Sequence, residues 1–495
     1  MKRFITKTFE FFEFGHLISN GYPTFLCKLW LMGNKEIQYY LSEYTTKIEI
    51  RQNNLDLFNI FYNNRLLTLD NENANEIIFQ KAIPTQVRAL KITKQMKIFK
   101  QFDFDMLPKK LIYLSINATN FTDATLKNLP EKTKLKTLDF TNCNNFTNNF
   151  GKYLPENLET LIVDNSNVLK FTTNEFITYL PCNLTSLSLH CGLTEIPDSI
   201  ENLSCLKLLN LRNNNITKIS EKIVNLSRLE YFCLNWNKLQ EELPTCIGKL
   251  SNLKTLELSF NNVRFLPDNI SLLKNLEHFD CSANELLHVT AHFKYLKNIK
   301  YLKLCTNQLY FFPTLLTELT NLQEIDISGN KIKKIPDDLT GLSQNLQILK
   351  LGNNRFQFIP DSIEKLTNLV ELYFEYNQLV NISAQIGNLS KLKILNLSNN
   401  ELENIPKEIG NLKFLKVLWL HNNKLSFVPE ELGNLTNLTI LELQQNNLQV
   451  LPESLLNLKF CLQRFYVHLN PGHYFMKENY KKNIGEECYK KIVIF

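Results

Sequence analysis

The sequence predicts an α/β solenoid: a curved horseshoe with a parallel β-sheet on its concave side and short helical or 3-10 segments on its convex side. Two observations lead to this fold class: a ladder of asparagines, and leucines at fixed offsets from each of them. Successive asparagines are 23 or 24 residues apart throughout. A fixed period in this range indicates stacked copies of one supersecondary unit. The ladder consists of Asn214, Asn237, Asn261, Asn284, Asn307, Asn330, Asn354, Asn377, Asn400, Asn423, Asn446 and Asn470.

The first part of each repeat is predicted to be a short strand. In one repeat the leucines Leu253, Leu256 and Leu258 precede Asn261. Apolar and polar residues alternate there, as in a strand with one buried face. The asparagine falls where the strand ends, and a buried amide at that point needs partners that the neighbouring repeat's backbone can supply. We therefore expect the ladder to be structural and not catalytic.

The second part of each repeat is predicted to return through a short helical segment. Pro267, Pro360 and Pro429 stand at the same place in three repeats, each followed by Asp or Glu. Proline pre-sets the first helical turn, and an early carboxylate suits a helix N-terminus. The convex side should therefore carry one helical or 3-10 turn per repeat.

The repeat extends toward the N-terminus, where the residues match the repeat pattern less closely. Counting strand anchors from Val87 to Leu462 gives 17 strands, and spacings of 26 and 22 residues on either side of Leu184 predict irregular loops. We expect three parts: an N-terminal cap over 1–86, an array of about 17 repeats over 87–470, and a C-terminal cap or tail over 471–495. The tail should contain a capping helix, because each unit of an array packs only on its neighbours and the ends need covers.

The spelling L-x-x-L-x-L-x-x-N-x-L, together with its period, resembles the leucine-rich-repeat superfamily. Its Leu/Ile-Pro-x-x-Ile segments, over about 184–470, are similar to those of the intracellular Ras-associated group. That resemblance implies scaffolding or signal transduction by protein binding. It names no partner, because many functions share this scaffold.

Composition favours a cytoplasmic protein that binds no nucleic acid and does not span a membrane. The net charge of +6 is modest, and no basic stripe suggests nucleic acid. The eleven cysteines are scattered without a C-x-x-C pair, as is usual in a reducing compartment. Glu10, Glu13 and His16 interrupt any signal peptide, and no stretch reaches the length of a membrane span. We expect a monomer.

Enzymatic motifs are absent from the sequence. There is no G-x-x-x-x-G-K-[ST] loop, no H-E-x-x-H and no G-x-S-x-G. His421 and His468 occupy one column but lie two repeats apart, about 10 Å, which is too far for two ligands of one zinc ion. We expect no catalytic residue, no cofactor and no metal.

The candidate site lies on the concave face, at positions that the repeat leaves free. Aromatic side chains are enriched at interface hot spots, so aromatic groups there predict a binding surface. One predicted group, around His278, contains Tyr231, Trp236, Phe260 and Tyr301. The other, which includes nearby charged residues, contains Tyr373, Tyr376, Trp419, His421, Tyr466, Glu371 and Glu375. An acidic patch between them contains Glu257, Asp280, Glu324 and Asp326, interrupted by Lys303.

Two alternatives to an intracellular scaffold stay open. Residues Leu26–Trp30 loosely resemble the end of an F-box, which would make the chain a substrate-recruiting adaptor of a ubiquitin ligase; degenerate repeats, as at Ile48 and Ile50, are the favoured interpretation of this region. Triplets such as Asn202-Leu203-Ser204 would be glycosylated in a secreted or receptor-like protein, although the repeat template itself produces them.

Overall fold

The computed structural model describes residues 47–50, 66–69, 88–92, 107–117, 122–127, 129, 134–143, 146–164, 174–484 and 493–494. The chain divides into two compact units, Met1–Asn215 and Ile216–Phe495, which are described separately below. The F-box-like stretch Leu26–Trp30 lies outside the described residues, as does most of the predicted cap over 1–86. The predicted boundaries at 86 and 470 stay predictions.

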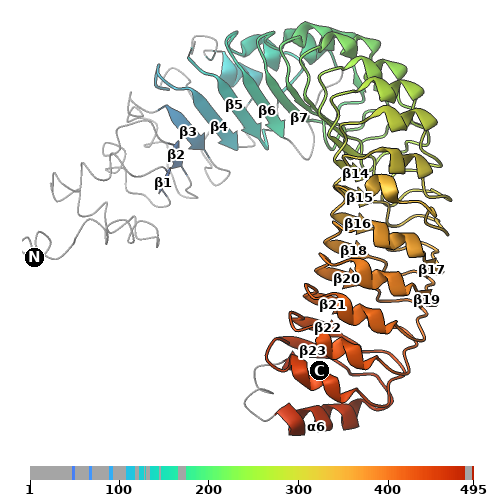
Figure 1. Cartoon of the computed structure of the whole chain (residues 1–495). Coiled ribbons are helices and arrows are strands. Elements are labelled where there is room, and N and C mark those ends of the chain that lie inside the picture. Colours follow the sequence, from blue (N-terminus) through green and yellow to red (C-terminus); the bar gives the residue numbers. More distant parts are fainter. Residues whose placement is uncertain are drawn as a thin grey trace, which may run out of the picture. The chain divides into compact units, whose positions relative to one another are not determined.

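In unit 1, the strands form a parallel sheet in chain order, each pairing with the next (Figure 1). These strands are β1 (Lys47–Ile50), β2 (Leu66–Leu69), β3 (Ala89–Ile92), β4 (Tyr113–Asn117), β5 (Thr137–Thr141), β6 (Thr160–Asp164), β7 (Ser186–His190) and β9 (Leu208–Asn210). The connections contain β8 (Glu195–Ile196) and the 3-10 helices η3 (Asp123–Leu126), η5 (Phe150–Tyr153), η6 (Asn174–Tyr179) and η7 (Asp198–Leu203). Phe140, Phe146, Phe150 and Phe176 are fully buried, and their rings contact one another in series: the first pair edge to face, the second stacked and the third tilted.

Unit 2 repeats the same plan with three-residue strands. They pair in parallel and in register as β11 (Tyr231–Cys233), β12 (Thr255–Glu257), β13 (His278–Asp280), β14 (Tyr301–Lys303), β15 (Glu324–Asp326), β16 (Ile348–Lys350), β18 (Glu371–Tyr373), β20 (Ile394–Asn396), β21 (Val417–Trp419), β22 (Ile440–Glu442), β23 (Arg464–Tyr466) and β24 (Val493–Ile494). Each of the 17 strands predicted between Val87 and Leu462 is present, so the parallel-sheet solenoid is confirmed.

The opposite side of unit 2 carries one short 3-10 helix per repeat (Figure 1). These helices are η8 (Glu221–Asn225), η9 (Thr245–Lys249), η10 (Asp268–Leu272), η11 (Ala291–Tyr295), η12 (Thr314–Glu318), η13 (Thr340–Leu342), η14 (Asp361–Lys365), η15 (Ala384–Asn388), η16 (Lys407–Asn411), η17 (Glu430–Asn434) and η18 (Glu453–Leu458). Two-residue strands lie between the two sides: β10 (Lys218–Ile219), β17 (Phe358–Ile359) and β19 (Asn381–Ile382). The prolines were expected in the first helical turn, but they precede it. Pro267, for example, is the N-cap residue of η10 and has an extended backbone (φ −67°, ψ 148°).

The core of unit 2 consists of the template leucines. Leu253, Leu256 and Leu258 are all 0% exposed, and their equivalents in other repeats are buried likewise. From β12 to β23 the three-residue strands have the burial pattern expected from period two, with a central buried residue between two exposed or partly exposed ones, whereas in β11 the outward Cys233 is buried as well. The outward positions are therefore free of packing constraints.

The asparagine ladder joins the repeats through backbone groups, as predicted. Asn261 accepts a hydrogen bond from the Leu239 N–H (3.0 Å), and its amide donates to the carbonyls of Leu234 (2.9 Å) and Leu258 (3.0 Å). The other ladder residues make equivalent bonds, and all twelve are at most 9% exposed. The hydrogen-bonding groups of these side chains are therefore used to hold the scaffold together.

The far end of unit 2 is covered by an α-helix, α6 (His473–Ile484). Met476, Tyr480 and Ile484 are buried, and the Tyr480 ring meets Phe465 of β23 edge to face at 5.3 Å between centroids. β24 adds a further strand beside β23. The last repeat thus has apolar cover on its exposed end.

Candidate functional site

The outward positions of the unit 2 strands form two straight columns, because the register is unbroken from β11 to β23. We call this surface, together with the two residues that precede each ladder asparagine, the strand face. It is the face predicted to be concave. One column reads Tyr231, Thr255, His278, Tyr301, Glu324, Ile348, Glu371, Ile394, Val417, Ile440 and Arg464. The other reads Cys233, Glu257, Asp280, Lys303, Asp326, Lys350, Tyr373, Asn396, Trp419, Glu442 and Tyr466.

Trp236 and Phe260, from successive repeats, form an exposed aromatic stack. Their ring centroids are 3.8 Å apart with an interplanar angle of 10°. Each residue is 46% exposed. Both stand immediately before a ladder asparagine, just beyond the end of their strands. The structure thus brings together two of the four aromatic residues predicted for the first group.

The backbone at these two positions is left-handed, with φ of 57° at Trp236 and 55° at Phe260. The reason is local: the N–H groups of Trp236 and Asn237 both donate to the next repeat, at Ser259 O (2.8 Å) and Phe260 O (3.2 Å). Consecutive residues of a regular strand direct their N–H groups to opposite sides, so the chain must turn at this point.

Aromatic residues are poorly suited to this conformation. A left-handed backbone brings the Cβ atom against the following carbonyl and costs about 1 kcal/mol or more for a side chain other than glycine, with asparagine among the best tolerated. Other repeats place Gly329 and asparagines such as Asn353 here, but also Ala283, Thr306, Gln445 and Leu469. Trp236, Phe260 and Tyr376 share the conformational cost with these non-aromatic residues and differ from them in presenting a ring at this position.

A second stack joins His278 and Tyr301 on neighbouring strands. Their rings are 4.5 Å apart and nearly parallel, at 9°. The Tyr301 hydroxyl donates to Gln323 Oε1 at 3.0 Å, which fixes the ring on the surface. Tyr231 is half-buried and lies two strands away from His278. Burial is the main cause that raises the pKa of its phenol, and the nearby Cys233 and Glu257 raise it further.

Carboxylates on β15 and β18 flank Lys350 of the strand between them, β16. Lys350 Nζ lies 2.8 Å from Glu324 Oε1, and the Tyr373 hydroxyl donates to Glu371 Oε2 at 2.9 Å. Burial opposes the charge of Lys350, but the bond to Glu324 and the nearby carboxylates raise its pKa. Burial, with a contribution from Asp326, also raises the pKa of Glu375, whose Oε2 atom is buried without a hydrogen-bond partner.

The second predicted aromatic group is spread out. Tyr373, Trp419 and Tyr466 share a column but alternate with Asn396 and Glu442. Two strand spacings, about 10 Å, separate each aromatic residue from the next. Tyr376, beside this column, is 57% exposed. These residues form a line of separate anchors along the strand face.

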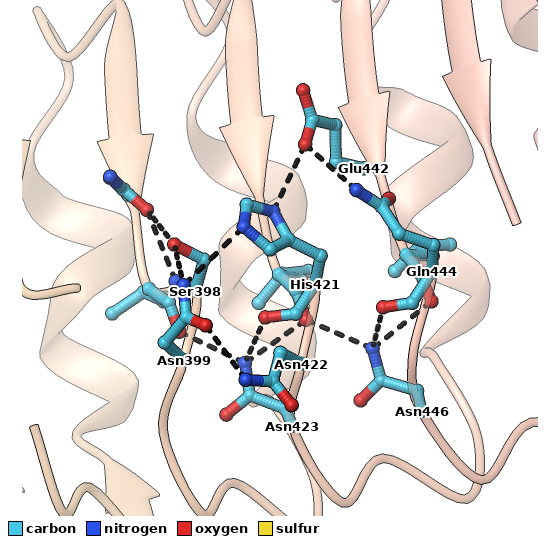
Figure 2. Close-up of polar contacts among 12 residues, drawn as sticks. Ser398, Asn399, His421, Asn422, Asn423, Glu442, Gln444 and Asn446 are labelled. Carbon is cyan, nitrogen blue, oxygen red and sulfur yellow. Dashed lines mark hydrogen bonds and ion pairs between the residues drawn. The ribbon is translucent and has the colours of Figure 1, made fainter. Parts of the chain in front are cut away.

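His421 lies two residues after Trp419 and belongs to a polar network (Figure 2). Its Nδ1 is 3.0 Å from Glu442 Oε2, at ion-pair distance but without hydrogen-bond geometry, and its Nε2 is 3.4 Å from the Asn399 amide. Glu442 also accepts from Gln444 Nε2 at 3.1 Å. Burial lowers the pKa of His421, and the Glu442 charge only partly offsets this.

Sequence reasoning missed a polar depression of about 520 Å³ in unit 1. His190 Nδ1 lies 2.8 Å from Asp164 Oδ1 there. The depression is lined by Thr141, Asn142, Asp164, Ser188, His190, Asn210, Arg212 and Asn213. The depression lies among the irregular repeats, where the sequence pattern does not fix the strand register reliably. The outward residues of β5, β6 and β7 were the sequence signal that could have found it.

Within the described residues, no three His, Cys, Asp or Glu side chains come together in a group that could hold a metal ion. None of the helices described is long and apolar enough to cross a membrane. What the strand face offers is exposed aromatic rings and carboxylates on a rigid sheet.

Known proteins similar to this chain share its repeat. A family model described as "Leucine-rich repeat region" matches residues 375–468, and one described as "Leucine rich repeat" matches 320–379 and 344–402. No curated protein matches.

Solved structures extend the similarity over most of the chain. A leucine-rich-repeat protein of Leptospira interrogans is 27% identical with a TM-score of 0.69, and the match covers 85% of this chain and 98% of that one. An internalin of Listeria monocytogenes is also 27% identical, with a TM-score of 0.52 over 58% of this chain and 82% of its own. The plant peptide hormone receptor RGFR1 in complex with RGF2 is 24% identical, with a TM-score of 0.58 over 86% and 69% of the two chains, and shows the fold alone.

Proposed function

We propose that this chain, which belongs to the leucine-rich-repeat superfamily, is a non-catalytic scaffold that binds a protein partner on the strand face of unit 2. The observation that carries the proposal is the exposure of three aromatic rings, those of Trp236, Phe260 and Tyr376, on the strand face. Large aromatic rings on a rigid surface are the residue type enriched at interface hot spots.

Tyr373, Trp419 and Tyr466 support the same conclusion from the other half of the strand face. Each is partly buried, and the hydroxyl of Tyr373 is held by Glu371 at 2.9 Å. A rigid aromatic anchor loses little side-chain entropy when a partner covers it. Together with Ile394, Val417 and Ile440, these anchors give a surface with apolar and polar parts.

We further propose a cytoplasmic location and a role in signalling. Eight cysteines within the described residues, among them Cys191, Cys233 and Cys281, form no disulfide bond. Unpaired cysteines are typical of a reducing compartment. The solved receptor in complex with RGF2 is a precedent for ligand binding by this fold. A secreted, receptor-like protein is the alternative, and it predicts N-linked glycan at sites such as Asn202 after expression through a secretory pathway.

The test uses the full chain as bait in cells that naturally express it, with captured proteins identified by mass spectrometry. The double variant Tyr373→Ala/Trp419→Ala should fold normally and lose most of the captured partner. The matched control is Phe311→Ala/Phe460→Ala, which removes two rings that are each 84% exposed but lie off the strand face. Equal capture by the wild type and the strand-face variant would contradict the proposal.

A further inference from the structure

We infer that the partner presents an extended, arginine-rich segment to the strand face between β11 and β18. This inference rests on the proposed function and deepens it by naming the chemistry of the partner. It follows from three features of one surface: its excess of carboxylates, the neutral groups that hold them, and the aromatic stacks beside them.

The strand face from β11 to β18 is acidic although the chain as a whole is basic. Its outward positions hold six carboxylates and the two lysines Lys303 and Lys350, so the local charge is 2 − 6 = −4, against +6 for the whole chain. Two surfaces of opposite charge steer each other into contact. The six carboxylates are Glu257, Asp280, Glu324, Asp326, Glu371 and Glu375.

Neutral donors orient several of these carboxylates and leave their charge in place. Glu257 accepts from the Asn235 amide at 2.8 Å. Asp280 and Asp326 each accept from the hydroxyl of a serine two residues later, at 2.6 Å. A hydrogen bond from an amide or a hydroxyl fixes a carboxylate without neutralising it. These groups are therefore positioned as acceptors for a cation supplied by another molecule.

The aromatic stacks select arginine over lysine. Trp236 and Phe260 leave nearly half of their surface accessible, and Glu257 belongs to the same repeat as Phe260. Asp280 lies on the same strand as His278, whose ring stacks on Tyr301. A planar guanidinium can stack on an aromatic face and bind a carboxylate with its edge, whereas an ammonium group is a point charge without a stacking plane.

The dimensions of the surface suit an extended segment that runs across the strands. Six strand spacings separate β11 from β18, which is about 29 Å. An extended chain rises by about 3.3 Å per residue, so about nine residues span the surface. Alternate side chains of such a segment point to the same side, and a segment with arginine at every second position can reach the carboxylates in turn.

The experiment measures binding of labelled nine-residue peptides to the full chain by fluorescence anisotropy at low and physiological salt. The first probe has arginine at every second position with serine between; matched probes carry lysine or glutamate instead. The test variant is Glu257→Gln/Asp280→Asn/Asp326→Asn, in which each amide oxygen keeps the acceptor role toward its neighbour. The matched control is Glu195→Gln/Glu403→Gln/Glu453→Gln, which removes three exposed carboxylates off the strand face.

We expect the arginine peptide to bind, the lysine peptide to bind several-fold more weakly, and the glutamate peptide not to bind. The test variant should weaken the arginine peptide by about tenfold, since three exposed ion pairs are lost. The control should weaken it by less than twofold. Higher salt should weaken binding to the wild type more than binding to the test variant.

A second variant tests the aromatic contribution. Trp236→Asn/Phe260→Asn places at both positions the residue type found at Asn353, so folding should be preserved. This variant should bind the arginine and lysine peptides equally. If the double variant keeps the full preference for arginine, if the control weakens binding as much as the test variant does, or if the arginine peptide fails to bind the wild type, the inference is overturned.

The capture experiment separates this inference from the proposed function. If Tyr373→Ala/Trp419→Ala loses the partner while the charge-removal variant captures it at the wild-type level, the strand face is the binding site and the partner is not cationic. In that case the proposed function stands and the inference of an arginine-rich segment is overturned.

Discussion

Replacing one ladder asparagine should destabilise the array, and the structure allows the size of the effect to be worked out. Asn330 is 8% exposed and sits between two regular repeats. Its Oδ1 accepts from the Leu309 N–H at 3.0 Å, and its amide donates to the carbonyls of Leu304 and Ile327, both at 3.0 Å. The substitution Asn330→Ala removes all of these bonds.

The three partners are affected unequally. The Leu304 carbonyl keeps a bond from Asn307, and the Ile327 carbonyl keeps one from Asn354, so each loses only one of two donors. The Leu309 N–H loses its side-chain acceptor in a buried site, which costs about 2 kcal/mol. Adding about 0.5 kcal/mol for each carbonyl gives a loss of about 3 kcal/mol.

Because stability in a solenoid depends on neighbouring units, the effect should be local. Hydrogen exchange measured by mass spectrometry should show peptides over 304–331 exchanging about a hundredfold faster, the rate change that corresponds to about 3 kcal/mol of local opening. Urea denaturation should show a lower midpoint. The control Asn404→Ala removes an exposed asparagine and should change neither. If Asn330→Ala resembled this control, the bonding scheme of the ladder would not account for its energetics.

Three further predictions concern packing, pH and the end of the array. Gly433→Ala should lower the free energy of unfolding by more than 1 kcal/mol, because the new Cβ would collide with the Ser454 carbonyl; urea denaturation measures this. The lowered pKa of His421 means that the unfolded chain takes up a proton first, so stability should fall as the pH drops below about 6.5. His421→Gln should reduce that dependence in urea midpoints compared at pH 7.5 and 5.5, and an unchanged dependence would assign it to other groups. Tyr480→Ala should cost about 3 kcal/mol by removing a buried ring from α6, seen as faster exchange confined to the last repeat.

The predicted site illustrates where sequence reasoning stops. The period assigned Tyr373, Trp419 and Tyr466 to one column, and the register confirms that column. The same reasoning placed the aromatic residues in two groups without showing which rings touch. In the structure, the aromatic residues of the column alternate with polar residues, and the first group, with His278, forms two separate stacks. The contribution of these residues to binding stays a prediction.

The sequence by itself determined the strands, the ladder and the outward columns of this protein, because a residue repeated every 23 or 24 positions experiences the same environment in every repeat. The tertiary structure alone decided which side chains meet. Trp236 reaches Phe260 because a left-handed turn aims both rings across the repeats, and His190 meets Asp164 across two strands whose connecting loop departs from the period. Periodicity fixes where a Cα atom lies along a strand, whereas backbone turns and side-chain rotamers decide where its side chain ends, and these depend on neighbours that are far away in the sequence.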